Sequence, residues 1–141
     1  MIDDRWAYVC ELDEELLKGG AVMSEWCAMI VREADLAFVG EAHLATVITA
    51  MAGIETHLRS ESEADRRVTS FDLIEQSDFT TEVKAELHEL RRYRNQWVHI
   101  SNPWNDEELL GNPQLYEDEL EKMALRAIRL LRKVVYSNPM I

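Results

Sequence analysis

The chain has 141 residues, of which 47% are hydrophobic and 30% charged, the composition of one soluble globular domain. It carries 27 acidic residues against 15 basic ones, and this net charge of −12 argues against a general affinity for polyanions such as nucleic acid. No apolar run is long enough to span a bilayer, the acidic N-terminus is unlike a signal peptide, and the two cysteines lack metal-type spacing, so we expect a cytoplasmic protein without membrane contact.

The composition favours helices throughout, because Ala, Leu, Glu and Arg dominate and only five Gly and three Pro interrupt them. We therefore predict a single all-α domain over residues 1–141, a bundle of about four long helices with additional short helices. Residues 1–20 form an N-terminal extension with a short amphipathic helix over 5–18, and residues 22–137 form the core bundle. Trp6 is expected on the inner side of the N-terminal helix.

Apolar residues at helical spacing, with capping residues and Gly or Pro at the boundaries, place the elements of the bundle. Long helices are predicted over residues 22–39, 41–61, 80–100 and 113–136. Asp78 and Thr80 are the candidate N-caps of the third long helix. Residues 71–76 are predicted to form one or two helical turns, and Asn105 with Glu108 resembles a capping box before another short turn.

The second long helix carries a carboxylate on its apolar face. Its core stripe consists of Leu44, Val47, Ile48, Met51 and Leu58. Glu55 falls on the same stripe, where a buried carboxylate needs a cationic or hydrogen-bonding partner. Arg59, one turn further on, is the favoured partner, in an ordinary pair at the edge of the surface. The alternative is that Glu55 faces Arg94 or His99 across the bundle.

The third long helix holds the residues with the clearest chemistry. Its apolar stripe runs through Val83, Leu87, Leu90 and Trp97. Arg94 occupies the position of that stripe between Leu90 and Trp97, although a buried guanidinium is costly unless it is paired. Asn95 and His99 lie one turn apart on a neighbouring face. Arg94 and His99 are separated by roughly 140° around an ideal helix, so they converge only if the arginine reaches round, the helix end distorts or two chains each contribute.

Arg94, four intervening residues and His99, with the polar Asn95 directly after the arginine, resemble the catalytic signature of the HEPN superfamily. The motif lies near the end of a late helix, and residues 41–60 look like the second long helix of bacterial members. The resemblance covers most of the chain from about Val22 onward. It implies a HEPN-like helical bundle that cleaves RNA without a metal or cofactor, as a homodimer in which two motifs meet at the interface.

The residue types of this motif suit cleavage of a phosphodiester by the neighbouring 2′-hydroxyl group of RNA. A histidine titrates near neutral pH and can accept the 2′-hydroxyl proton or deliver a proton to the leaving oxygen. An arginine keeps its charge and offers fixed donors to the phosphorane as negative charge develops. We therefore assign catalytic roles to Arg94, Asn95 and His99, with Asn95 expected to orient the imidazole or bind the phosphate.

Basic and aromatic residues are further candidates for binding RNA, and Glu55 is a candidate supporting residue of the site. The basic candidates are Arg91, Arg92, Lys122, Arg126, Arg129 and Lys133. Those of the last helix either line an electropositive cleft or complement the dipole of a helix that opens with acids and closes with bases. Trp97 and Trp104 offer rings for base stacking, although Trp97 continues the core stripe and is better explained by packing.

The histidines do not have the spacing of a metal site. None of the four follows a Glu by three residues, as in the di-metal carboxylate bundles, and we expect neither a metal nor a cofactor. His43 and His57 are expected to face solvent or an interface, and His88 is expected to be exposed.

The function expected from the motif is that of a metal-independent endoribonuclease in a toxin–antitoxin or phage-defence system. The strong acidity favours a basic protein partner such as an antitoxin. The alternative is a non-catalytic HEPN-fold binding module for a protein partner or a nucleotide. The complete set of Arg94, Asn95 and His99 favours the enzyme, because a degenerate domain would usually have lost one of them.

Overall fold

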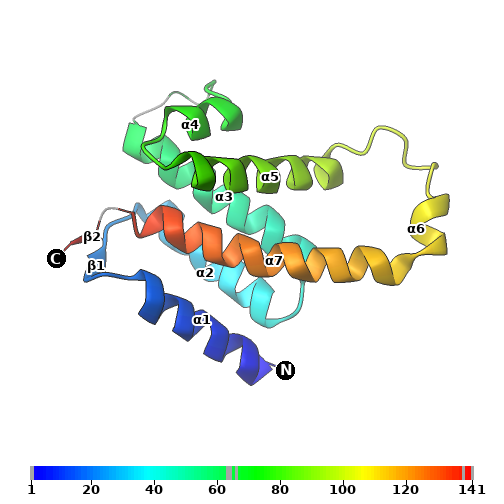
Figure 1. Ribbon diagram of the computed structural model, residues 1–141, viewed down its shortest axis with the longest axis horizontal. Coiled ribbons are helices and arrows are strands. Elements are labelled where there is room, and N and C mark those ends of the chain that lie inside the picture. The colour runs from blue at the N-terminus through cyan, green and yellow to red at the C-terminus, as the bar shows by residue number, and fades with distance from the viewer. Residues whose placement is uncertain (1, 63–64, 66, 138, 141) are drawn as a thin grey trace.

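The computed structural model of the chain describes residues 2–62, 65, 67–137 and 139–140 and consists almost entirely of helices (Figure 1). The helices are α1 (Ile2–Leu16), α2 (Glu25–Val39), α3 (His43–Ser62), α4 (Ser70–Gln76), α5 (Thr81–Val98), α6 (Glu107–Gly111) and α7 (Pro113–Val135). The strands β1 (Gly20–Ala21) and β2 (Pro139–Met140) pair antiparallel and bring the C-terminal end of the chain beside the segment after α1. The all-α fold predicted from the sequence is confirmed. Within the described residues, no helix combines the length and the hydropathy needed to cross a membrane.

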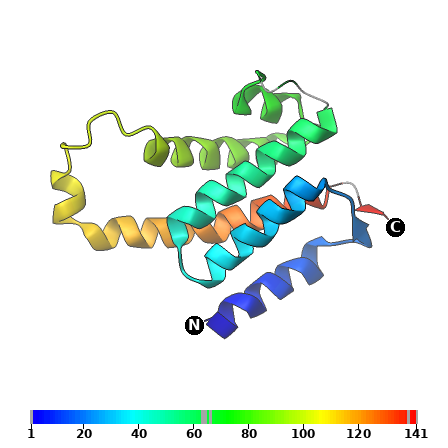
Figure 2. The same cartoon turned by 180° about the vertical axis from the view of Figure 1, so that it is seen from behind.

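The centre of the bundle is formed by α3 and α7, which make its most extensive contact with one another. The helix α2 covers another side of α3, α1 packs against α2 and α7, and α5 lies along α3 and α7, as two opposite views show (Figure 1 and Figure 2). The close approach at the centre depends on Gly53, since a Cβ atom there would lie 2.9 Å from Leu131 Cδ1 and 3.2 Å from Ile30 Cγ2. A larger residue at position 53 would therefore force Leu131 to move within a close-packed core.

Hydroxyl side chains fix where three of the helices begin. Ser24, Thr69 and Thr80 accept hydrogen bonds, at 3.1, 3.2 and 3.2 Å, from the backbone N–H group three residues further on. Each bond satisfies a donor that the first turn of a helix would otherwise leave without a partner. Ser24 explains why α2 begins at Glu25 rather than at 22 as predicted, and Thr80, rather than Asp78, caps α5.

The connection between α5 and α6 extends away from the bundle (Figure 1). It covers residues 99–106, and the capping box predicted at Asn105 is wrong, because Asp106 is the residue that precedes α6 and its side chain makes no capping hydrogen bond. None of the residues of α6 is buried. This part of the chain therefore contributes no residue to the buried core.

The first helix is an integral part of the bundle. It runs from Ile2 to Leu16 and buries Val9 and Leu12, in addition to the charged Arg5. The guanidinium of Arg5 lies over the ring of Phe38 at 4.8 Å from its centroid. The expectation that Trp6 faces inward is wrong, since this side chain is exposed, and the helix is rotated so that Arg5 takes the inner position. The helix is thus packed into the bundle rather than appended to it, and five helices, rather than four, have fifteen or more residues.

A buried arginine joins α7 to α1 and α2. Arg132 is 1% exposed; its Nε donates to Asp13 Oδ1 at 2.9 Å, and its Nη1 and Nη2 donate to the two carboxylate oxygens of Asp35 at 2.8 Å each. The hydroxyl of Tyr136 donates to the same Asp13 oxygen at 2.7 Å. The pKa of Tyr136 is raised by its burial and by this neighbouring carboxylate. All three nitrogens of the guanidinium are satisfied, which makes burial of its charge tolerable.

Candidate functional site

The motif residues lie on the last two turns of α5 and at its end. The helix stops at Val98, and His99 is the residue after it, with φ of −126° and ψ of 54°. The backbone N–H of His99 still donates to the carbonyl oxygen of Asn95 at 3.0 Å. The side chains of Arg94 and Asn95 are half-buried against the bundle, whereas that of His99 is exposed.

Arg94 forms an ion pair with Glu55 of α3. Its Nη2 lies 2.9 Å from Glu55 Oε1, and the two side chains are only 16% and 22% exposed. The preference for an Arg59–Glu55 pair is therefore wrong; Arg59 instead donates to the backbone oxygens of Asp65 and Val68, at 2.6 and 3.2 Å. The N–H groups of Arg94 are not well aligned on Glu55 Oε1, so the contact is an ion pair without a well-formed hydrogen bond. The two charges that interrupt the apolar stripes of α3 and α5 thus compensate one another.

The amide of Asn95 holds the other side of the guanidinium. Arg94 Nε donates to Asn95 Oδ1 at 2.9 Å, so this amide oxygen orients the arginine. The proposed contact between Asn95 and the imidazole of His99 is not formed within the chain. Two edges of the Arg94 guanidinium are therefore fixed, while its Nη1 has no acceptor among the residues that the structure describes.

His99 is separate from this cluster in a single protomer. Its imidazole is exposed and makes no hydrogen bond or ion pair within the described part of the chain. The structure thus brings together Arg94, Asn95 and Glu55 but does not join His99 to them through a side-chain contact. A charged donor group and an accessible imidazole nevertheless occupy neighbouring turns at the same end of α5.

Exposed apolar side chains occur at the end of the motif helix and in the chain that follows it, as far as the first turn of α7. They are Val98, Ile100, Trp104, Leu109, Leu110 and Leu115, with Trp104 89% exposed. Trp97 is half-buried and packs edge-on against Tyr116 of α7, with the ring centroids 6.4 Å apart, which supports the packing role. A hollow of about 250 Å³ opens beside these rings, between the end of α5 and the start of α7. Exposed apolar side chains beside such a hollow are typical of a surface that contacts another molecule.

The basic face predicted on the last helix is largely paired with acids. Arg126 donates to both carboxylate oxygens of Glu89 on α5 at 2.9 and 2.7 Å, and Arg129 donates to both oxygens of Glu15 on α1 at 2.9 and 2.6 Å. These hydrogen bonds lower the pKa of both glutamates. Lys133 lies 4.0 Å from Glu86. Three of the four basic residues that could have formed an electropositive cleft on this helix are therefore engaged in ion pairs with acids of the same chain.

The remaining basic candidates lie on two sides of α5. Arg92 and Lys122 form no ion pair within the described residues, and together with Arg126 they line a hollow of about 300 Å³ between α5 and α7. Arg91 instead turns toward α4, with its guanidinium 5.5 Å from the ring centroid of Phe71. Arg92 and Lys122 are thus the basic candidates without an ion pair in the described residues, although Glu89 and Glu119 line the same hollow.

Two histidines are buried, contrary to expectation. His88 is buried, and its Nε2 lies 2.7 Å from Glu75 Oε1, because α4 folds back over the first half of α5. His57 is 2% exposed and lines a pocket at the C-terminal end of α3. Sequence reasoning missed this pocket, although His57 directly precedes the core residue Leu58 on a helix with several buried rows. Among the described residues, no group of three His, Cys, Asp or Glu side chains is placed to hold a metal ion.

Comparison of the chain with models of protein families, with curated proteins and with solved structures finds no match in any of the three. The HEPN resemblance of the motif therefore stays a prediction.

Proposed function

We propose that the protein is a HEPN-like, metal-independent endoribonuclease that acts as a homodimer, with Arg94, Asn95 and His99 as its catalytic residues. The observation that carries the proposal is the held guanidinium of Arg94, whose Nη1 is left without an acceptor in the described chain, at the same helix end as the exposed His99. We also propose a toxin or defence role and an antitoxin-like protein partner, which the same resemblance implies.

The cleavage step uses the chemistry of these side chains. An imidazole removes the proton of a ribose 2′-hydroxyl, the 2′-oxygen bonds to phosphorus, and the bond from phosphorus to the 5′-oxygen breaks. A second imidazole, in the protonated form, gives its proton to the departing 5′-oxygen, which leaves a 2′,3′-cyclic phosphate and a 5′-hydroxyl. Arg94 donates to the phosphorane oxygens, and its fixed orientation reduces the reorganisation needed as charge develops.

A homodimer supplies what one protomer lacks. The motif of one chain has a single histidine, whereas the reaction uses one base and one acid. The exposed apolar side chains beside His99, including Ile100 and Trp104, provide a surface that a second copy would cover in a symmetric contact. Two motifs would then face one another with water excluded from around them.

A non-catalytic binding module is the second candidate function, and the internal pairing of basic residues favours it. Arg126 and Arg129 are bound to Glu89 and Glu15, and Arg94 itself is neutralised by Glu55. With a net charge of −12, the chain offers little general attraction to RNA, and a basic protein partner would meet a more favourable field.

An RNA cleavage assay in the presence of EDTA separates the two candidates. We expect wild-type protein to cut RNA to a 2′,3′-cyclic phosphate and to leave DNA and 2′-O-methyl RNA intact. His99→Ala and Arg94→Met should each lower the rate by about 10²-fold or more, since each removes a group that acts in the transition state. Arg32→Ala is the matched control, because Arg32 is exposed on α2 and contacts Met29 and Glu33 of the same helix.

The oligomeric state is measured on the same samples. Light scattering should give a dimer at micromolar concentration, and Ile100→Asp should yield folded monomers that no longer cleave RNA. Metal-dependent cutting, or full activity of the His99→Ala and Arg94→Met variants, would show the proposed mechanism to be wrong. A monomer that retains full activity would rule out the composite site.

A further inference from the structure

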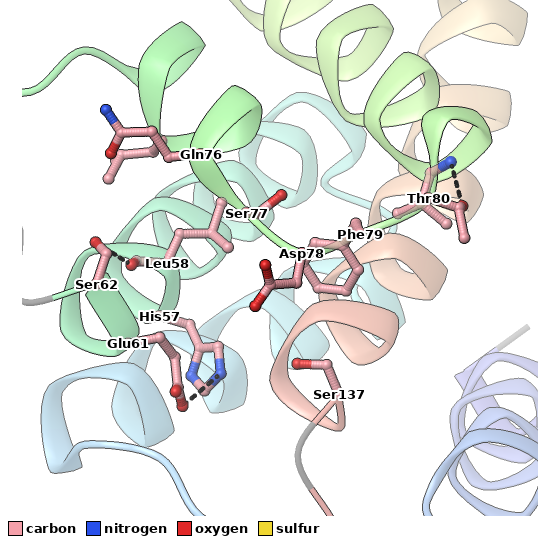
Figure 3. A pocket seen from close by; sticks show the side chains of 12 residues that line it. His57, Leu58, Glu61, Ser62, Gln76, Ser77, Asp78, Phe79, Thr80 and Ser137 are labelled. Atoms are coloured by element: carbon pink, nitrogen blue, oxygen red, sulfur yellow. Dashed lines mark hydrogen bonds and ion pairs between the residues drawn. The ribbon is translucent and has the colours of Figure 1, made fainter.

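A second candidate site lies at the end of α5 opposite the motif. A pocket of about 470 Å³ opens between the C-terminal part of α3, the turn that joins α4 to α5, and the end of α7 (Figure 3). In Figure 3 the carboxylate of Asp78 points into the space between His57 and Ser137. Its apolar lining comes from Leu58, Leu73, Phe79 and Val83. The volume is within the range of small-ligand sites in proteins.

Most of the polar side chains that line this pocket are acceptors, although Gln76 and Thr80 also carry donor groups. The hydroxyls of Ser62, Ser77 and Ser137 donate their protons to backbone carbonyl oxygens three or four residues earlier in the chain, at 2.8, 2.6 and 2.7 Å. Their oxygens can therefore only accept from a ligand. Asp78 adds a carboxylate, which also accepts only, and no Lys or Arg is among the described residues that line the pocket. The pocket is thus matched to a group with several donors and a positive charge.

The buried imidazole of His57 is part of the same wall. His57 Nδ1 has no hydrogen-bond partner in the described chain, and Nε2 lies 3.4 Å from Glu61 Oε1 without forming a well-aligned hydrogen bond. Burial lowers the pKa of His57, against the opposing effect of Glu61, so the ring is neutral near pH 7 and keeps an acceptor nitrogen. Buried polar atoms without a partner are rare and often mark a place where a ligand completes the hydrogen bonding.

We propose that this pocket binds an organic cation, an alkylammonium or alkylguanidinium head group on an apolar stem. The head group would be held by Asp78, by the hydroxyl oxygen of Ser137 and by the acceptor nitrogen of His57. The stem would pack on Phe79 and Val83. The acidity of the whole chain raises the local concentration of such a ligand.

This inference goes beyond the proposed function and does not depend on it. The pocket includes Thr80, which caps the N-terminus of α5, whereas the motif lies at the C-terminus of the same helix. None of the residues of the motif lines the pocket. Binding can therefore be measured without reference to cleavage of RNA.

Isothermal titration calorimetry on the full chain tests the proposal with four small probes of one stem length. We expect n-butylguanidinium and n-butylammonium to bind, and n-butanol and butyrate not to bind. Asp78→Asn should weaken binding of the cations about tenfold or more, since it removes the charge from a charge-assisted hydrogen bond. Asp78 forms no ion pair within the described residues, so this variant should fold normally. Asp72→Asn is the matched control, because Asp72 is an exposed carboxylate of α4 that does not line the pocket.

Nitrogen NMR of the histidine side chains supplies a second measurement. Addition of n-butylguanidinium should shift the ring nitrogens of His57 and leave those of the exposed His99 unchanged. The proposal is overturned if the cations show no binding at about 10 mM, which corresponds to a free energy too small for a built site. Equal binding of butyrate, or an unchanged affinity of Asp78→Asn, would also overturn it.

The natural cation could be a free small molecule or a side chain of a partner protein. A blocked arginine, N-acetyl-arginine-N-methylamide, distinguishes these sources because its backbone is amide-linked at both ends. Binding at least as tight as that of n-butylguanidinium would assign the pocket to an arginine side chain of a partner. Binding of the free alkyl cations alone would assign it to a small molecule.

Discussion

Two arginines interrupt apolar helix faces in this protein, and their surroundings differ. Arg132 of α7 is 1% exposed, and all three of its nitrogens donate to the carboxylates of Asp13 and Asp35. Arg94 of α5 pairs with one carboxylate, that of Glu55, and with the amide of Asn95, and its Nη1 has no acceptor among the described residues. All guanidinium nitrogens of Arg132 thus have an acceptor, whereas Arg94 keeps N–H donors that a ligand could use.

This difference in hydrogen bonding indicates different roles for the two arginines. A fully satisfied and fully buried guanidinium has no free donor for a ligand, so Arg132 serves to join three helices. A guanidinium held on two edges, near the surface and beside an exposed imidazole, has the preorganisation and the free donors that a transition state requires. The comparison therefore predicts that stability depends mainly on Arg132, and that the proposed cleavage of RNA depends mainly on Arg94.

The largest effect on stability is expected from Arg132→Met. Removal of the guanidinium leaves the carboxylate of Asp35, which is only 14% exposed, without its partner in the bundle. The free energy of unfolding should fall by about 3–5 kcal/mol, as measured by urea denaturation. The fraction that remains folded should cleave RNA at the wild-type rate. A loss below about 1 kcal/mol would mean that the cluster is not a structural centre.

A double-mutant cycle on Glu55 and Arg94 should show a smaller effect. Each single change, Glu55→Leu or Arg94→Met, leaves a charge on an apolar face, and the double change removes both charges. We expect an interaction energy of about 1–3 kcal/mol, with the double variant more stable than the sum of the single changes predicts. Thermal unfolding measures it, and an interaction near zero would mean that the two side chains do not meet in solution. The double variant should also have lost RNA cleavage.

A buried histidine should account for a separate and weaker effect on stability, one that depends on pH. Burial lowers the pKa of His57 in the folded chain, which means that the unfolded chain binds a proton more readily. The contribution of His57 to stability is present above the ordinary histidine pKa of about 6.5 and is lost as the pH falls below it. Wild type should therefore lose more thermal stability between pH 8 and pH 5 than His57→Gln does. Identical pH profiles for the two proteins would contradict this assignment.

The smallest effect is expected at the paired surface of α7. The Arg126–Glu89 pair is well aligned, but its side chains are 33% and 53% exposed and remain in contact with solvent. Arg126→Ala should change the free energy of unfolding by less than about 1 kcal/mol, and added salt should reduce the difference further. A decrease in the free energy of unfolding as large as that expected for Arg132→Met would contradict the distinction between buried and solvent-exposed ion pairs. Urea denaturation at low and high salt provides the measurement.

The local elements of this fold could be predicted because their signals are local. The apolar spacing of α3, α5 and α7 placed these helices within a few residues of their observed ends. Hydroxyl residues and Pro113 mark helix starts through contacts within one turn of the chain. The errors at Trp6 and at Asn105 arose where two faces or two caps were equally compatible with the local pattern.

The candidate site could be predicted only in part. Arg94 and Glu55 stood out because each places a charge on an apolar stripe, but the nearer Arg59 appeared the better partner for Glu55 along the helix. The contact across α3 and α5 prevailed because Arg59 is used by the backbone oxygens of the segment after α3. The burial of His88 could not be predicted either, because α4 covers this side chain only once the chain has folded.

The sequence by itself determined the helical class and the order of the elements, because both follow from composition and from periodicity within single helices. It also determined which residues are candidates for the proposed cleavage of RNA. Tertiary structure alone decided which charges meet: Arg94 with Glu55, Arg132 with Asp13 and Asp35. It also created the pocket around His57, whose lining comes from segments far apart in the chain. Such pairings depend on how helices pack and rotate against one another, and no property of a single helix specifies that rotation.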